Sequence, residues 1–181
     1  LLSGNLLTVD IQNSYRKIIE IMKNILEEIA ARTRERIAKE KTCISVSELE
    51  NRIQEVNKNA GKRITFLQAL QKDGMSYICE VKKASPSKGL IAPDFPYLAI
   101  AKEYEQAGAS AISCLTEPFY FQGADQYLRE ISAAVQIPVL RKDFTVDEYM
   151  IYQAKSLGAS AVLLICAILD DGELRSEERR V

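Results

Sequence analysis

Apolar residues recur at helical spacing in the first third of the chain. With charged residues between them, this spacing predicts a long amphipathic helix that ends near Lys39. Residues 45–48 (SVSE) match a capping box, so a second helix is expected to begin there, and residues 66–70 favour a short third one. The first helix has the apolar stripe Tyr15, Ile18, Ile19, Met22, Ile25, Leu26 and Ile29, and the second has Leu49, Ile53 and Val56.

From residue 76 the pattern changes to short apolar runs of the kind found in buried strands, separated by helical patterns. The first helical pattern opens after Pro93 and Pro96 and stops at Gly108. The next is expected to be capped by Asp125, and the last follows a capping box at residues 145–148 (TVDE). Strands begin at intervals of 23 to 34 residues, which is typical of βαβ units and a parallel sheet. The predicted strands are 76–81 (SYICEV), 110–115 (SAISCL), 137–140 (IPVL) and 160–165 (SAVLLI).

A short internal repeat agrees with this arrangement. AGASAI at residues 107–112 recurs as LGASAV at residues 157–162, two βα units later, and each marks a helix end, a glycine stop and a buried strand. Either a doubly wound sheet or part of a barrel fits the pattern. Neither GxGxxG nor GxxxxGK[ST] follows the first strand, which disfavours a nucleotide-binding fold.

Amino-acid composition and charge exclude several classes of function. The chain has 181 residues, 24 Lys plus Arg and 25 Asp plus Glu, so its net charge of −1 gives no basic footprint for nucleic acid. No apolar run approaches the roughly 18 residues of a membrane span, and the first residues carry no secretion signal, so a cytoplasmic protein is expected. The absence of histidine excludes His-based triads and His–metal sites in this chain. With no CxxC pair, four cysteines are expected to be small hydrophobic residues in a reduced compartment: Cys43, Cys79, Cys114 and Cys166.

Charged residues stand where two of the predicted strands end. Side chains alternate along a strand, so Glu80 and Lys82 share a face, and Lys142 follows the third strand. One interpretation is an exposed strand end or a structural ion pair, on the third strand between Lys142 and Asp143. The other is a site at the carboxyl edge of the sheet, where barrel enzymes keep their chemistry. A desolvated lysine there can act as a general acid or anchor a phosphate or carboxylate.

Two loops that follow strands carry further candidate chemistry. Residues 84–89 (ASPSKG) offer hydroxyls and backbone amides to an anion, although such stretches are commonly plain turns. Residues 116–121 (TEPFYF) put three aromatic side chains into a strand-to-helix connection. These rings either pack against the core or form a wall for a flat ring.

Together these segments closely resemble indole-3-glycerol phosphate synthase, a family of the tryptophan pathway. The resemblance runs in order from about Met22 to Leu169. It implies an α/β fold of the (β/α)8 TIM-barrel family, with N-terminal helices packed near the barrel mouth. It also implies a carbon–carbon lyase (a carboxy-lyase) that converts 1-(2-carboxyphenylamino)-1-deoxyribulose 5-phosphate to indole-3-glycerol phosphate with loss of CO2 and water, using no metal and no cofactor. The segments that carry it are ICEVKKASPSKG (78–89), LTEPFYFQG (115–123), PVLRKDF (138–144) and LGASAVLLICAIL (157–169).

By match of motif, the resemblance implies roles for residues at both strand ends. Lys142 is the implied general acid on the sugar carbonyl during ring closure. Lys82 is implied near the substrate carboxylate and as a candidate second acid, and Glu80 as the group that orients the lysines. Ser85 is implied near the phosphate. The pocket around the aromatic ring is expected to be lined by Phe121, Phe144 and Leu163.

The resemblance covers the first four strands of an eight-stranded barrel, and a closed barrel typically needs about 200 to 250 residues. The expectation is therefore a barrel truncated after about four strands. Its parts are an N-terminal extension (1–21), a helical segment (22–75), the first half of the barrel (76–169) and a charged, unrelated or disordered tail (170–181). The family's general base and its glycine-rich phosphate loops come later than the matched segments, so the isolated chain is expected to be inactive.

Two alternatives stay open. One is an inactive half barrel that self-associates through its open sheet edges. The other is a related phosphosugar barrel such as phosphoribosylanthranilate isomerase, which shares the phosphate site but acts on a different intermediate. A small phosphosugar is the expected partner of either enzyme, with no nucleic acid and no membrane.

Overall fold

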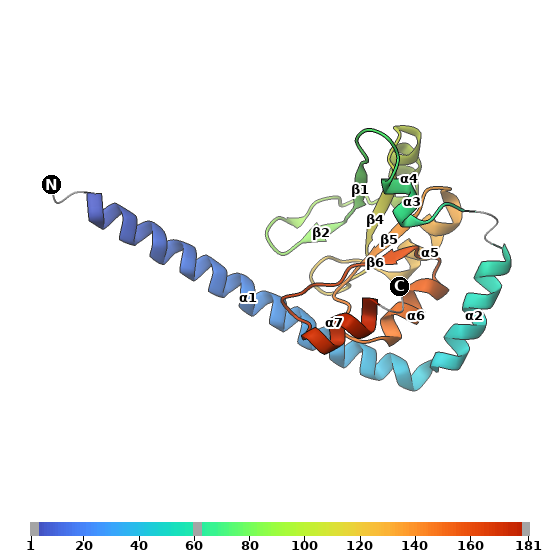
Figure 1. The fold of residues 1–181 in the computed structure, drawn as a ribbon, viewed down its shortest axis with the longest axis horizontal. Helices are drawn as coiled ribbons and strands as arrows, with labels where there is room; N and C mark the ends of the chain where they lie inside the picture. The colour runs from blue at the N-terminus through green and yellow to red at the C-terminus, as the bar shows by residue number, and fades with distance from the viewer. Residues whose placement is uncertain (1–3, 60–62, 179–181) are drawn as a thin grey trace.

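A computed structural model describes the backbone of residues 4–59 and 63–178, and the side chains of residues 24–58 and 63–175. A parallel β-sheet stands at the centre of the body, with helices packed around it (Figure 1). One very long helix at the N-terminus projects well beyond this body. The predicted α/β class is therefore confirmed in the described part of the chain.

Two helices precede the sheet, as the sequence predicts. Helix α1 (Gly4–Cys43) runs unbroken through the expected boundary at residue 21, and helix α2 (Val46–Asn59) turns back along the far side of the body (Figure 1). The hydroxyl half of the predicted capping box forms, because the Glu48 amide donates to Ser45 Oγ at 3.1 Å. A short helix, α3 (Phe66–Leu70), follows. The predicted stripe members Tyr15, Ile18, Ile19 and Met22 lie outside the described side chains.

Four parallel strands form the sheet, in the order β1-β4-β5-β6. The antiparallel hairpin β2–β3 follows β1, and one helix connects each strand of the sheet to the next. The strands are β1 (Ile78–Val81), β2 (Ala84–Ser85), β3 (Gly89–Leu90), β4 (Ala111–Leu115), β5 (Val139–Lys142) and β6 (Ala161–Val162). The connecting helices are α4 (Tyr97–Gln106), α5 (Asp125–Ala134) and α6 (Tyr149–Ser156), and α7 (Asp171–Glu178) follows β6.

The helices α4, α5 and α6 cover one face of the sheet. Alternate strand residues point into this apolar core. A second cluster ties α1 and α2 to α6, so the N-terminal helices are anchored on the same side. The strand residues of the main core are Val81, Ile112, Cys114 and Val139, and the helix residues include Ala101, Leu128, Ile131 and Ala154.

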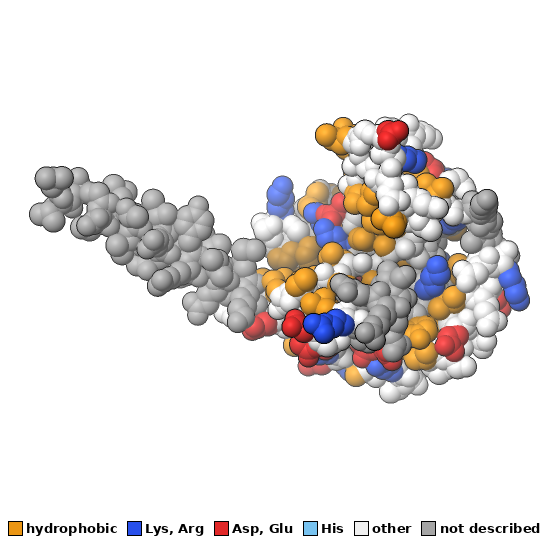
Figure 2. Space-filling model, viewed as in Figure 1, with side chains coloured by type: hydrophobic (Ala, Val, Ile, Leu, Met, Phe, Trp, Pro, Cys, Tyr) orange, Lys and Arg blue, Asp and Glu red, His pale blue; other side chains and the backbone are white. Residues whose placement is uncertain are grey.

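The opposite face, which we call the inner face, carries the other alternate residues. In register across the strands these are Glu80, Ser113, Leu140 and Ala161, with Lys142 one step further along β5. Within the described residues the sheet is open, and β1 and β6 are its two edges. Hydrophobic side chains gather around α3 and β1 on the face shown in Figure 2.

Several local predictions differ from the structure. Asp125 does not cap α5: its carboxylate accepts a hydrogen bond from Arg141 instead. The capping box at Thr145 does not form, since α6 begins at Tyr149 without a side-chain cap and the Thr145 hydroxyl is buried without a partner. β6 spans two residues rather than six, having a strand on one side alone. Residues 171–178 form helix α7, so disorder, one of the two descriptions expected for the tail, does not hold for this stretch.

The internal repeat seen in the sequence is also a repeat of structure. Gly108 and Gly158 both end a helix with positive φ, +91° and +90°. Two residues later the amide of Ser110 donates to Tyr77 O, and the amide of Ser160 donates to Val139 O, both at 2.8 Å. The unit β1–α4–β4 therefore recurs as β5–α6–β6.

The cysteines differ in burial. Cys114 lies in the core, and burial raises the pKa of its thiol to about 12, as expected for a small hydrophobic residue. Cys43 and Cys166 are exposed and Cys79 is half-buried, so that prediction is wrong for them. Among the described helices, each is too short or too polar to cross a bilayer.

Candidate active site

The ends of β1 and β5 bring three predicted residues together on the inner face. The Glu80 carboxylate accepts from Lys82 Nζ at 2.5 Å through one oxygen and from Lys142 Nζ through the other. The side chains of Glu80, Lys82 and Lys142 are 24%, 33% and 40% exposed, so all three reach solvent. We call these three residues the lysine cluster. Sequence alternation predicted this face. The contact between Glu80 and Lys142 spans β4, which lies between β1 and β5 in the sheet.

Glu80 holds a negative charge between the two ammonium groups. Burial raises the pKa of its carboxyl, but hydrogen bonds from Lys142 and Lys82 and the charges of both lysines lower it more. The net result is a pKa below the usual value, so the carboxylate stays ionised at neutral pH. Both lysine side chains are thereby held over the inner face, where a bound molecule would meet them.

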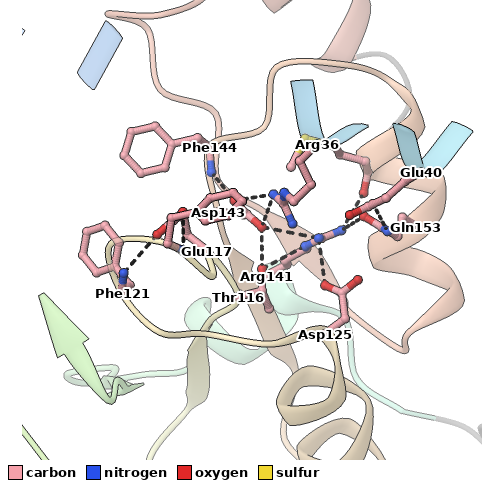
Figure 3. Close-up of polar contacts among 12 residues, drawn as sticks. Arg36, Glu40, Thr116, Glu117, Phe121, Asp125, Arg141, Asp143, Phe144 and Gln153 are labelled. Atoms are coloured by element: carbon pink, nitrogen blue, oxygen red, sulfur yellow. Dashed lines mark hydrogen bonds and ion pairs between the residues drawn. The ribbon is translucent and has the colours of Figure 1, made fainter. Parts of the chain in front are cut away.

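The other side of β5 carries a second ion cluster, which is buried. Arg141 is fully buried and donates to Gln153 on α6 at 2.7 Å and to Asp125 on α5 at 2.9 Å (Figure 3). It also donates to Thr116, whose hydroxyl in turn donates to Asp143 at 2.8 Å. We call this group the arginine cluster. Since Lys142 lies between Arg141 and Asp143 in the chain, the arginine cluster fixes the strand end from which Lys142 projects.

Helix α1 completes the arginine cluster. Arg36 donates through Nη2 to both carboxylate oxygens of Asp143, at 3.1 and 3.0 Å (Figure 3). Burial raises the pKa of Asp143, but the charges of Arg141 and Arg36 and hydrogen bonds to the carboxylate outweigh it and lower the pKa. The predicted Lys142–Asp143 pair is therefore wrong: the two side chains point to opposite faces, and Lys142 pairs with Glu80.

A buried carboxylate shapes the aromatic loop after β4. Glu117 is 0% exposed and accepts hydrogen bonds from the amides of Phe119, Tyr120 and Phe121, at 2.7 to 3.0 Å. The loop then passes so close to β4 that a Cβ at Gly123 would lie 2.5 Å from Leu115 O, so only glycine fits there. Sequence reasoning singled out the three rings and missed Glu117, although its position two residues before the first ring is a local signal.

Two of the aromatic residues face each other where the loop meets the end of β5. The rings of Phe121 and Phe144 lie 6.4 Å apart between centroids, at an interplanar angle of 40° (Figure 3). The other two rings contact α1, because Arg32 lies over Phe119 and Tyr120, at 5.8 and 5.5 Å from their centroids. The predicted aromatic wall thus divides into a pair near the strand ends and a pair clamped by α1.

The remaining predicted residues lie at the rim. Ser85 is buried in the β2–β3 hairpin, where its hydroxyl accepts from the Lys88 amide at 3.2 Å. The hydrogen bonds described for Ser85 stay within this turn, so it is not joined to the lysine cluster. Leu163 is half-buried just beyond β6, and its amide donates to Arg141 O at 3.3 Å.

Two surface hollows of the body lie away from the lysine cluster. One of about 400 Å³ opens between α2, α6 and β6, and one of about 750 Å³ opens between α2 and the C-terminal ends of α5 and α6. None of Glu80, Lys82 and Lys142 lines either hollow. Among the described residues, no cluster of carboxylates and cysteines is arranged to hold a metal ion. The candidate site is therefore an open face with two cations and an aromatic flank.

The comparisons with known proteins all identify the same family. Residues 26–179 match the family model described as indole-3-glycerol phosphate synthase. A protein of that name from Ruminiclostridium cellulolyticum is 52% identical over 152 residues, which are 83% of this chain and 57% of the relative. One from Lacticaseibacillus paracasei is 53% identical over 151 residues, and one from Aliarcobacter butzleri is 46% identical over 151 residues, with the same coverage. The chain thus spans somewhat more than half the length of these relatives.

Proposed function

Because this chain belongs to the indole-3-glycerol phosphate synthase family, we propose that its lysine cluster supplies the acid groups for that family's ring closure. The substrate is 1-(2-carboxyphenylamino)-1-deoxyribulose 5-phosphate, and the product indole-3-glycerol phosphate forms with loss of CO2 and water. The single observation that carries the proposal is the Glu80 carboxylate, which bridges two lysines on the inner face. Family barrels keep their chemistry at this end of the strands.

Lys142 is the general acid in this proposal. When the aromatic ring attacks the sugar carbonyl carbon, negative charge develops on the carbonyl oxygen. An ammonium group within hydrogen-bond reach can donate a proton to that oxygen, which later leaves as water. The side chain of Lys142 is 40% exposed and points from the strand end over the inner face, so a substrate can reach it.

Lys82 and Glu80 have supporting roles. Lys82 lies on the same carboxylate as Lys142 and offers a second positive charge, which suits the carboxylate that the substrate loses as CO2. It is also a candidate second acid. Glu80 is a positioning residue here, because its two oxygens hold one lysine each.

The proposed substrate-binding surface lies at the rim of the candidate site. Phe121, Phe144 and Leu163 offer an apolar flank to the aromatic ring of the substrate, and the Phe121–Phe144 pair supports this. Ser85 and the amides of the β2–β3 hairpin are proposed to lie near the phosphate. We propose no metal and no organic cofactor for the reaction, and a cytoplasmic location for the enzyme.

The proposal is tested in a chimera that completes the barrel. Residues 26–169 of this chain replace the matching segment of the Ruminiclostridium cellulolyticum relative, and formation of indole-3-glycerol phosphate is measured. We expect Lys142→Ala to lower kcat by about 10²-fold or more, and Glu80→Gln to lower it by a smaller factor. Lys41→Ala, which removes an exposed lysine of α1, is the matched control. Wild-type kcat in the Lys142 variant would reject the assignment.

The 181-residue chain alone is proposed to be inactive. It spans 57% of its relative, and the lysine cluster provides acids but no second carboxylate free to act as a base. Purified chain is incubated with the substrate, and we expect no product above the uncatalysed rate. Turnover of the substrate would contradict this inactivity, and isomerisation of phosphoribosylanthranilate by the chimera would favour the related isomerase instead.

A further inference from the structure

One buried carboxylate has no part in the proposed acid chemistry. Glu117 is 0% exposed, and burying a carboxylate is costly unless hydrogen bonds compensate it. Its Oε1 accepts from the amide of Phe119 at 2.9 Å, and its Oε2 accepts from the amides of Tyr120 at 2.7 Å and Phe121 at 3.0 Å. Both oxygens of this side chain are therefore used on one short stretch of backbone.

These contacts belong to a turn that begins and ends at residue 117. At the far end of the turn, the amide of Gly123 donates to the backbone oxygen of Glu117 at 2.8 Å. Just before it, Gln122 has a φ of 51°, a left-handed conformation that non-glycine residues seldom adopt and that the surrounding contacts must hold. The backbone of the turn is thus closed at its ends, and the Glu117 side chain holds its middle.

The turn determines where the ring of Phe121 lies. This ring faces Phe144 beyond the end of β5 (Figure 3). The amide of Phe144 donates to the buried carboxylate of Asp143 at 2.8 Å, and the amide of Phe121 is held in the same way by Glu117. Asp143 also binds two arginines, whereas the described hydrogen bonds of the Glu117 carboxylate serve the turn alone.

We propose that Glu117 is a positioning residue, which holds Phe121 where the aromatic ring of the substrate packs. The inference rests on the proposed function, because that function assigns the substrate ring to this flank. A contact between two rings contributes fully only at a suitable distance and angle. Since Glu117 binds the backbone of Phe121, a change in the carboxylate moves this ring without removing it.

Glu117→Gln tests this role with little change of shape. One of the two terminal groups of glutamine is an NH2 donor. Whichever way the amide is turned, this donor faces at least one of the three N–H groups, so the turn has to rearrange. In the chimera that completes the barrel, we expect KM to rise about 10-fold and kcat to stay within about twofold, as for a lost contact that acts on substrate and transition state alike.

Two comparisons make this test specific. Glu105→Gln is the matched control, because Glu105 accepts from the amides of Gln136 and Ile137 at 2.6 and 3.1 Å, before β5 begins. It should leave KM unchanged. Phe121→Ala should raise KM by itself, and adding Glu117→Gln should raise it no further, because the carboxylate acts through that ring. An equal rise with and without the ring would overturn the proposal.

Hydrogen exchange gives a readout that needs no substrate. In the Glu117→Gln chimera, the amides of Phe119, Tyr120 and Phe121 should exchange about 10-fold faster or more, as expected when a hydrogen bond to a charged group is lost. The amides of β4 should keep their rates, which checks that the variant folds. If it does not fold, Glu117→Asp, which keeps the charge and shortens the reach, takes its place in every measurement.

The outcomes separate this inference from the proposed function. If Lys142→Ala lowers kcat but Glu117→Gln leaves KM or the exchange of residues 119–121 unchanged, the positioning role is wrong and the proposed reaction stands. If Lys142→Ala leaves kcat unchanged, the acid assignment is wrong. A rise in KM that requires the ring of Phe121 then still supports the positioning role of Glu117.

Discussion

Two ion clusters lie on opposite faces of the same strand, and they differ in almost every property. The lysine cluster on the inner face has one carboxylate for two lysines, and every member reaches solvent. The arginine cluster on the helix-covered face surrounds Asp143 and Arg141, whose side chains are 0% exposed, with partners from α1, α5 and α6. Adjacent residues of β5 thus enter two different environments because side chains alternate.

The difference distinguishes side chains that can contact a ligand, as in the lysine cluster, from side chains that stabilise the fold, as in the arginine cluster. Arg141 uses its Nε, Nη1 and Nη2 atoms on protein partners, so it has little left to offer a ligand. Each lysine has one described carboxylate partner and solvent around it. Charge alone does not identify a site, since both clusters carry two cations. Accessibility and unused hydrogen-bonding capacity distinguish them.

The largest expected contrast is in stability after a carboxylate is neutralised. Asp143→Asn leaves Arg141 and Arg36 without their shared anion in a buried place, and breaking such a pair costs about 3 to 5 kcal/mol. Glu80→Gln, the matched change in the lysine cluster, should cost less than about 1 kcal/mol because the lysines remain hydrated. Urea denaturation of the two variants measures both values. Similar losses in the two variants would remove the distinction between the clusters.

The next contrast concerns the link to α1. Arg36→Met removes a two-oxygen contact with buried Asp143, and hydrogen bonds to charged groups contribute about 1.5 to 3 kcal/mol. Lys41→Met, on the same helix, removes an exposed pair with Asp147 and should cost less than about 1 kcal/mol. Hydrogen exchange of α1 gives the local readout. If Lys41→Met loosens α1 as much as Arg36→Met does, the arginine cluster is not the anchor.

The sequence predicted one cluster and missed the other for a physical reason. Glu80, Lys82 and Lys142 follow from alternation along β1 and along β5, which is a local rule. Arg36 and Asp143 lie 107 residues apart, and nothing in either local pattern tells how α1 docks. The predicted capping role of Asp125 failed because a buried guanidinium competes for its carboxylate. The order of strands and helices could be predicted from periodicity. The length of β6 could not, because it depends on pairing with adjacent strands, which periodicity does not describe.

As the pH falls, the lysine cluster should lose the stabilising contribution of Glu80 before the arginine cluster loses that of Asp143. The pKa values of Glu80 and Asp143 are lowered from their usual 4.5 and 3.8, so each carboxylate stabilises the fold above its usual pKa. That contribution declines as the pH falls below the usual value and through the lowered one. The stability difference between wild type and Glu80→Gln should therefore be constant near neutrality and shrink below about pH 4.5. The difference for Asp143→Asn should shrink only below about pH 3.8. Denaturation series from pH 7 to 3 measure both, and the reverse order would contradict these assignments.

The smallest expected effect is the most informative about Lys142. Its side chain is 40% exposed and Glu80 keeps Lys82 as a partner when Lys142 is replaced. Lys142→Met should therefore change the free energy of unfolding by less than about 1 kcal/mol, within the range of surface ion pairs. The same change in the chimera removes the proposed acid and should abolish most of kcat. A loss of stability as large as that of Asp143→Asn would mean that Lys142 belongs to the structural scaffold, and a drop in kcat could then no longer be assigned to proton transfer.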